Sequence, residues 1–329
     1  AGAAVKGGKG GIGSGVAINT IENTTTAYVE NIVSTGVRAV DVLAMTNNQI
    51  ESFANSVGVL ANGASGGLSF NKIENTTTAR ITDSDFGATL SDSELERVFV
   101  AAIDASDIFA QVGGAALSTG GTLGIGLSYA SNDIRSSTNA KIENTTMAVA
   151  GDIFVEALAF NEIETYAIAG TGGATVGLAG AATINDITSS VTAKISGGSI
   201  LAEGNIDVVA SQDTVLEASA LSISIGTTAG IGGGVLINTV NTTTNALITG
   251  GATVDALGLL EAREVPISER DANSGDPVSE VSAGLALIAL AATRLDPTAL
   301  SIAGGTSTAG VALASSSSVV RDTTLASVG

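Results

Sequence analysis

Apolar and polar residues alternate along most of this chain. At one recurring phase, two small or β-branched apolar residues flank a variable one. This period of two predicts β-strands with one buried face. The flanking pairs are Ala27/Val29, Ala79/Ile81, Ala140/Ile142, Ala193/Ile195 and Ala246/Ile248, and the residues between them are Tyr28, Arg80, Lys141, Lys194 and Leu247.

These steps belong to a longer repeat that begins with asparagine. Asn19-Thr-Ile-Glu-Asn-Thr-Thr-Thr-Ala27 returns as Asn71-Lys-Ile-Glu-Asn-Thr-Thr-Thr-Ala79, and weaker copies begin at Asn132, Asn185 and Asn238. The separations are 71 − 19 = 52, 132 − 71 = 61, 185 − 132 = 53 and 238 − 185 = 53 residues. A nearly fixed period of this size indicates a repeat protein whose units bury their apolar faces by stacking.

The repeat predicts an all-β solenoid that runs as one continuous unit through residues 1–329. Ile21-Glu22 is echoed by Ile50-Glu51, which predicts two coils of about 26 residues in each repeat of roughly 53. That makes roughly 12 coils and a body on the order of 50 to 60 Å long. The repeats lie near residues 7–62, 63–118, 119–174, 175–230 and 231–309, with a partial copy at 310–329.

Stacked identical positions predict ladders inside the solenoid. The repeat asparagines are expected where one strand bends into the next, because asparagine bonds its own turn and tolerates left-handed backbone. Stacked asparagines can pair above and below one another, which predicts a ladder inside a solenoid corner. The predicted ladder residues are Asn19, Asn71, Asn132, Asn185 and Asn238, together with Val29, Ile81, Ile142, Ile195 and Ile248.

Two segments, near residues 83–96 and 263–277, interrupt the period. Ser91-Asp-Ser-Glu94 has the spacing of a helix capping box, which predicts a short helical excursion in the first segment. Residues 281–292 carry no charged side chain, are nearly all apolar and fit a helix or a strand. The uncharged stretch around Thr165–Asn185 contains several glycines and shares the repeat phase, so it predicts solenoid strands rather than a transmembrane segment.

Composition narrows the chemistry that the chain can carry. The formal net charge of −19 with only 13 Lys and Arg argues against a nucleic-acid partner, because phosphate binding depends on cationic side chains. Histidine and cysteine are absent, which excludes catalytic triads with histidine, thiol nucleophiles and most zinc sites. The glycine-rich runs lack the sequence of a phosphate-binding loop and predict turns and close backbone approach.

The remaining candidate ligands are carboxylates and amides in the two interrupting segments. Their oxygen atoms would suit Ca²⁺, but neither segment has the spacing of a known calcium loop, so solvated loops without a cofactor are expected. These weak metal candidates are Asp83, Asp85, Asp271, Asn273 and Asp276. Other carboxylates, such as Glu22, Glu74 and Glu143, recur with the repeat instead of forming a unique cluster, which predicts a protein that is not an enzyme.

Threonine-rich turns raise an alternative function. Thr24–Thr26, Thr76–Thr78 and Thr242–Thr244 could stack into a flat hydroxyl face that binds ice or a glycan. The third and fourth copies read Arg135-Ser-Ser-Thr138 and Thr188-Ser-Ser-Val191, so the threonine register is not expected to persist. A lesser alternative is a polysaccharide-degrading β-helix enzyme that acts through a pair of carboxylates.

The motif Asn19-Thr-Ile-Glu-Asn-Thr-Thr-Thr-Ala-Tyr-Val-Glu, followed by Val40-Asp-Val-Leu-Ala, resembles the repeat region of large bacterial filamentous adhesins. The likeness is to leukotoxin-type adhesins, relatives of filamentous haemagglutinin exported by two-partner secretion, and covers residues 7 to about 250. The resemblance implies a right-handed parallel β-helix rod on the outside of a bacterial cell. The expected function is therefore that of an extracellular structural protein, whose partners would include a host or neighbouring cell surface.

Neither end of the sequence has the pattern of a solenoid cap. Ala1–Gly15 is rich in glycine, and Ser315–Gly329 follows a degraded repeat. Because uncapped solenoids expose unpaired strands, we expect self-association end to end into a filament. Stretches that are apolar on both faces, such as Ala174–Ile184 and Leu285–Ala292, predict lateral contacts in addition.

Overall fold

The computed structural model describes residues 2–6, 10–91, 93–270, 277–305, 307 and 309–329. All regular elements within these ranges are β-strands, which confirms the all-β prediction. The described residues contain no helix long and apolar enough to cross a membrane. The strands are β1 (Gly2–Lys6), β2 (Gly11–Glu30), β3 (Ala39–Leu60), β4 (Gly63–Thr82), β5 (Arg97–Ser118), β6 (Leu123–Val149), β7 (Ile153–Ala202), β8 (Ile206–Thr249), β9 (Thr253–Ala256), β10 (Arg263–Arg270), β11 (Pro277–Ser282), β12 (Leu285–Gly305) and β13 (Ala309–Val328).

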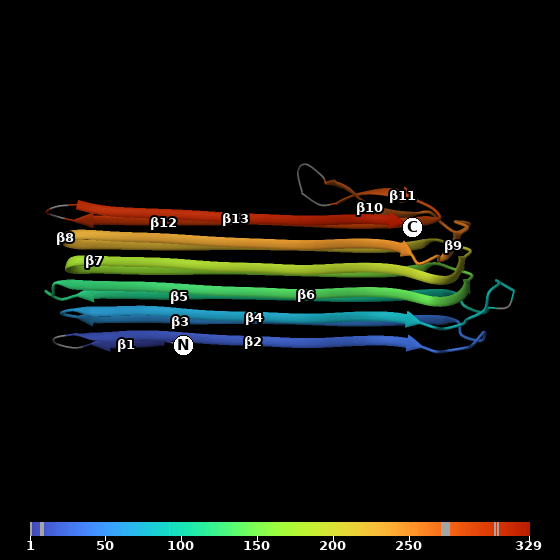
Figure 1. Cartoon of the computed structure of the whole chain (residues 1–329), viewed down its shortest axis with the longest axis horizontal. Helices are drawn as coiled ribbons and strands as arrows, with labels where there is room; N and C mark the ends of the chain where they lie inside the picture. The colour runs from blue at the N-terminus through green and yellow to red at the C-terminus, as the bar shows by residue number, and fades with distance from the viewer. Residues whose placement is uncertain (1, 7–9, 92, 271–276, 306, 308) are drawn as a thin grey trace.

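The strands form two facing stacks of parallel strands (Figure 1). Sheet A contains, in order, β1, β3, β5, the first halves of β7 and β8, and β12. Sheet B contains β2, β4, β6, the second halves of β7 and β8, and β13. Each rung of the stack runs along sheet A and returns along sheet B, and in the second to fifth rungs a tight arch joins the two directions. Strands β7 and β8 are long because each spans a whole rung.

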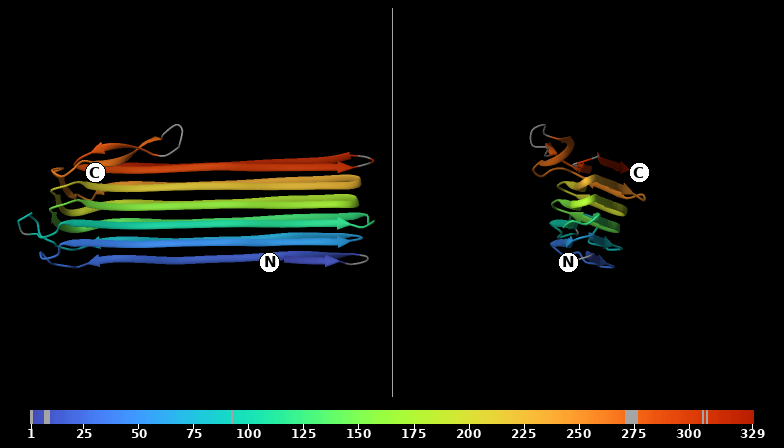
Figure 2. Two further views of the ribbon diagram at one scale, coloured as in Figure 1. Left: turned by 180° about the vertical axis from the view of Figure 1, so that it is seen from behind. Right: turned by 90° about the vertical axis from the view of Figure 1, so that its left-hand side faces the viewer.

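The register corrects the predicted size of the coil. Asn71 pairs with Asn132, and paired positions in neighbouring rungs are separated by a whole repeat, so the chain makes one turn per repeat instead of two. Ile21 and Ile50 echo each other because they meet from opposite sheets in one core cluster. Six rungs at ~4.8 Å give a stack only about 25 to 30 Å tall, whereas a strand of about 20 residues is roughly 70 Å long. The long axis therefore follows the strands (Figure 2).

The core changes character along the rungs. Towards the corners it contains large aliphatic side chains such as Ile81, Ile142 and Ile195, all with no exposed surface. Towards the arches the sheets come close together, and a Cβ atom on Gly126 would lie 2.3 Å from the carbonyl oxygen of Gly170. Only small side chains fit there, which explains the glycine-rich run that precedes Asn132.

The first interrupting segment is a loop without a helix among its described residues, so the predicted helical excursion is wrong. The loop places Leu95 in the core with 1% of its surface exposed. The backbone N–H groups of Glu94 and Glu96 donate to the carbonyl oxygens of Thr35 and Arg38, at 3.1 and 2.7 Å. Burial of Leu95 and pairing with the rung below outweigh the local capping signal.

The second interrupting segment contributes the antiparallel hairpin β10–β11, which lies along the chain between the strands of the fifth and sixth rungs. Arg263 docks it on sheet A through an ion pair with Asp207 at 2.6 Å, and its guanidinium carbon lies 4.0 Å from the ring centroid of Phe154. Residues 281–292 contain the end of β11 and the start of β12, so this stretch forms strands and no helix. Leu285, the first residue of β12, pairs in parallel with Ile206. The stretch Thr165–Asn185 lies within β7, as the repeat phase predicted.

The register predicts opposite outcomes for charge at two adjacent positions of β6. Ile142→Asp would bury an unpaired carboxylate between the sheets and should destabilise the protein by at least about 3 kcal/mol. Lys141→Asp changes an outward side chain and should alter stability by no more than about 0.5 kcal/mol. Urea denaturation of both variants checks the register, and equal losses of stability would contradict it.

Candidate functional site

The five repeat asparagines lie in one column inside the stack, within the strands and not at the corner where the ladder was predicted. Each donates a hydrogen bond from its Nδ2 atom to the next rung: Asn19 to Asn71 at 2.8 Å, Asn71 to Asn132 at 2.8 Å, Asn132 to Asn185 at 2.8 Å, and Asn185 to Asn238 at 3.0 Å. Asn238 continues the column to Ser318 Oγ at 3.3 Å. A buried amide left unpaired would be costly, so this column ties every rung to the next in one register.

The predicted aliphatic ladder forms a second column at the corner end. Its members pair in register from rung to rung: Val29, Ile81, Ile142, Ile195 and Ile248. Four of them are 2% exposed or less, and Val29 of the first rung is partly buried against the same cluster. Both columns hold neighbouring rungs in register.

A further column of residues, which was not predicted from the sequence, lies at the corners between rungs. Two residues after each ladder aliphatic, the backbone adopts a positive φ, which asparagine, aspartate and glycine tolerate best. The corner residues are Asn31 (φ 57°), Asp83 (φ 50°), Asn144 (φ 49°), Gly197 (φ 64°) and Gly250 (φ 69°). Their fixed distance from the Ala-x-Ile step was the available signal.

The predicted metal candidates have structural roles where they are described. Asp83 is a corner residue and accepts a hydrogen bond from Asn144 at 3.2 Å. Asp85 accepts one from the backbone N–H of Gly87 at 3.0 Å. Asp271, Asn273 and Asp276 lie outside the described residues. Within the described part of the chain, no group of three or more carboxylates is arranged to hold a metal ion.

One carboxylate lies inside the stack. Asp104 of β5 has no exposed surface and terminates a chain of amides that crosses between the sheets. Asn23 donates to Asn48 at 2.8 Å, Asn48 to Asn75 at 2.7 Å, and Asn75 to Asp104 at 2.8 Å. Ser106 donates to the other carboxylate oxygen at 3.1 Å. Burial raises the pKa of Asp104 to about 6, although these hydrogen bonds oppose the shift.

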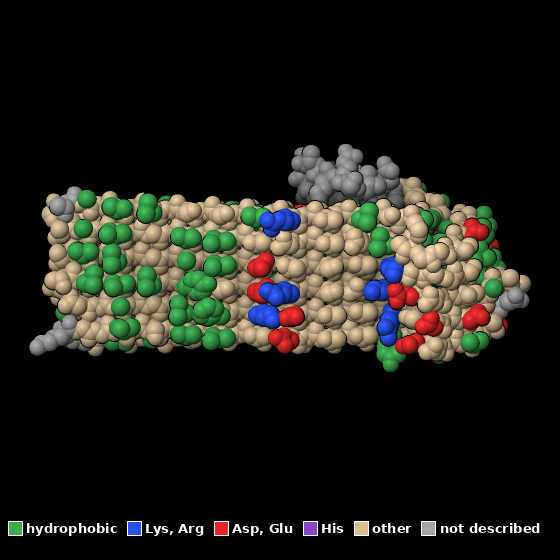
Figure 3. Space-filling model, viewed as in Figure 1, with side chains coloured by type: hydrophobic (Ala, Val, Ile, Leu, Met, Phe, Trp, Pro, Cys, Tyr) green, Lys and Arg blue, Asp and Glu red, His purple; other side chains and the backbone are tan. Residues whose placement is uncertain are grey.

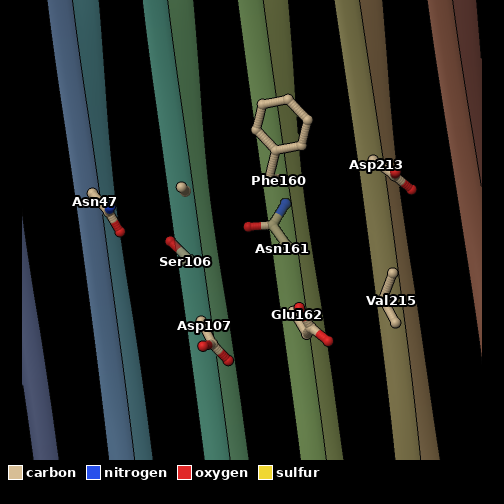
Figure 4. A pocket seen from close by; sticks show the side chains of 9 residues that line it. Asn47, Ser106, Asp107, Phe160, Asn161, Glu162, Asp213 and Val215 are labelled. Carbon is tan, nitrogen blue, oxygen red and sulfur yellow. The ribbon is translucent and has the colours of Figure 1, made fainter.

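The outer face of sheet A carries a strip of carboxylates from neighbouring rungs. Asp107, Phe160, Glu162 and Asp213 line a shallow hollow on this face (Figure 4). Gln49 donates to Asp107 at 2.9 Å. Beside the hollow, the rings of Phe53 and Phe109 lie 5.6 Å apart, and those of Phe109 and Tyr166 lie 6.2 Å apart.

The carboxylates of this strip disfavour one another's charged form. Burial raises the pKa of both Asp107 and Glu162, and nearby carboxylates raise it further. The geometry therefore describes an acidic surface whose members repel one another.

The outer face of sheet B is divided into bands (Figure 3). Apolar side chains gather near the arches, and two narrow charged columns flank a band of hydroxyl and amide residues. One column of that band has a hydroxyl in every rung: Thr24, Thr76, Ser137, Ser190, Thr243 and Thr323. The threonine register is interrupted in the third and fourth rungs, as expected, but the serine that replaces threonine there keeps a hydroxyl group in this column.

The neighbouring outward column is less regular. It contains Thr26, Thr78, Asn139, Thr192, Asn245 and Leu325. We call the two columns together the hydroxyl band.

Comparison with known proteins gives no match, whether with family models, curated sequences or solved structures.

The buried carboxylate predicts a pH-dependent stability. Because the pKa of folded Asp104 lies above its ordinary value of 3.8, the folded state holds the proton more tightly than the unfolded state. Stability from this group should be greatest below pH ~4 and fall as the pH rises towards 6, by on the order of 3 kcal/mol. Asp104→Asn keeps the acceptor for Asn75 and should remove this loss.

Thermal denaturation from pH 4 to pH 8 tests the effect. Asp104→Asn should be more stable than the unmodified protein at pH 8 and similar to it at pH 4. Asp213→Asn, on the outer face of sheet A, is the matched control and should not show this difference. A variant of Asp104 that is no more stable at pH 8 would contradict the assignment.

Proposed function

We propose that this chain is a structural β-solenoid rod of an extracellular fibre or bacterial surface adhesin. The observation that carries the proposal is the continuous Asn column, in which every rung repeats the contacts of the last one. Such a stack makes a stiff, extended body from one repeating contact, and rungs of the same kind can be added at either face. The motif around Asn19 and Asn71, which resembles filamentous adhesins, supports an extracellular setting.

The proposed rod is a right-handed parallel β-helix with one turn per repeat of about 53 residues. Connections between parallel strands of one sheet are right-handed in nearly all proteins, because of the twist of the strands. The separations of 53 residues along the Asn column support this turn length. The acidic character of the chain supports a soluble exterior.

End-to-end growth can be tested at the sixth rung. Val320 occupies the inward position that Val240 holds in the rung below, and it is 42% exposed because no further rung covers it. A second copy that stacks on β13 would bury this side chain. Val320→Lys should therefore abolish the stacking, since the ammonium group would be buried without a partner.

Val319→Lys is the matched control, because Val319 is the adjacent residue on the outer face and is 38% exposed. Negative-stain images and light scattering at rising concentration should show rods that lengthen for the unmodified protein and the control but not for Val320→Lys. Particles of one fixed length for all three proteins would contradict self-association through this end.

A second candidate function is ice binding, and the hydroxyl band favours it. Neighbouring members lie about 4.8 Å apart between rungs and roughly 6.7 Å apart along a strand. A flat, regular array of hydroxyl groups can hold water molecules in ordered positions. The second column is interrupted by Asn139, Asn245 and Leu325. We therefore favour the structural function over ice binding.

Measurement of ice recrystallisation tests this second function. Thr192→Lys places a long charged side chain within the hydroxyl band, whereas Thr188→Lys places one outside it on the same strand. If the band binds ice, the unmodified protein and Thr188→Lys should slow recrystallisation, and Thr192→Lys should not. Normal recrystallisation in the presence of the unmodified protein would rule out this function.

A further inference from the structure

Near the arches the usual distribution of side chains is inverted. The interior there is small and polar: Ser52 bonds to Ser69 at 2.7 Å, and Ser56 bonds to Ser65 at 2.6 Å. The large apolar side chains point outward instead. Since the close approach of the sheets excludes large side chains from the interior, burial of this apolar surface requires a contact outside the stack.

The apolar surface is continuous across sheet B. Each rung contributes at least one large exposed residue to it: Ile18 (71%), Phe70 (40%), Leu127 (53%), Ile184 (37%), Ile237 (42%) and Leu313 (69%). We define the arch-end patch as the outward positions 12–18 of β2 and those in register with them in the other rungs. No charged residue occupies these positions, and Figure 3 shows the patch as the apolar end of the face.

The size of the patch matches what a stable dimer needs. Its four outward columns cover about 25 Å along the strands, and six rungs cover about 29 Å across them. The resulting area is on the order of 700 Å², close to the ~800 Å² that each partner contributes to a standard protein interface. A second copy of the chain would cover it completely, because the patch would meet a surface of the same extent.

Charge and relief also favour a second copy. The chain has a net charge of −19, so two copies repel each other over most of their surfaces, and the uncharged patch is where this repulsion is weakest. One outward column of the patch alternates between small and large residues: Gly66 and Gly180 flank Leu127, and Gly233 lies beside Leu313. Two sheets can pack with the large side chains of one over the small residues of the other.

We propose that the arch-end patch is an interface through which two copies of this chain pack sheet B to sheet B, side by side. This contact is separate from the end-to-end stacking proposed above. Stacking buries the inward side chains of the last rung, whereas the lateral contact buries outward side chains of all six rungs. A rod can therefore lengthen and pair independently.

Sedimentation velocity at rising concentration tests the lateral contact. Ile18→Lys combined with Ile237→Lys should raise the dissociation constant of the pair at least ~100-fold, because the interface would bury unpaired ammonium groups. Thr24→Lys combined with Thr243→Lys adds the same charge to the same two strands outside the patch and should leave association unchanged. Val320→Lys should be included in every protein, so that end-to-end stacking does not contribute.

Cross-linking identifies the occupant. The chain contains no cysteine, so an introduced thiol is unique. Ser131→Cys, within the patch, should form a disulfide-linked dimer under mild oxidation, whereas Ser137→Cys, in the hydroxyl band, should not. A monomer at all concentrations, equal association of the two lysine variants, or equal cross-linking of the two thiols would overturn the proposal.

Discussion

The structure depends on the strict parallel register between neighbouring rungs. Strand pairing places each residue beside its counterpart one turn away, so side chains of one column meet above and below one another. A buried amide is tolerated where a neighbouring rung or the facing sheet offers a hydrogen-bond partner, and the column from Asn19 to Asn238 meets this condition with an amide in each of five rungs. A slip of one residue would turn every buried side chain outward, so the Asn column and the aliphatic column specify one register together.

The same constraint decides how much of the fold follows from sequence. The alternation around Ala79 and Ile81 was sufficient to predict strands, their buried face and the stacking of repeats, since these depend on local periodicity. The number of coils per repeat could not be predicted from local periodicity. Ile21 and Ile50 look like successive copies of one unit, yet they face each other across the core, and only the pairing of distant strands distinguishes the two arrangements.

The candidate sites show the same division between local and distant information. Asp83 has a side chain that could bind a metal ion, but it lies in the corner column because its backbone adopts a positive φ. The sequence signal for that corner is a fixed separation of two residues from Ile81. The capping box at Ser91–Glu94 describes a helix locally, but burial of Leu95 determines the loop. Asp104 could not be identified from sequence as the buried end of an amide chain, because its hydrogen-bond partner Asn75 comes from a different rung.

Register also explains how a chain with so little catalytic chemistry can have distinct surfaces. On the outer faces no packing constraint selects the residue type, so each column is free to be apolar, hydroxyl or charged, and stacking multiplies that choice across six rungs. A single exposed leucine is unremarkable on any protein. A column of them becomes a surface large enough to bind another molecule, and the narrow interior beside the arches leaves such columns no alternative place to be buried. The geometry that restricts the core mainly to small residues such as serine, alanine and glycine at this end therefore also creates the apolar patch outside it.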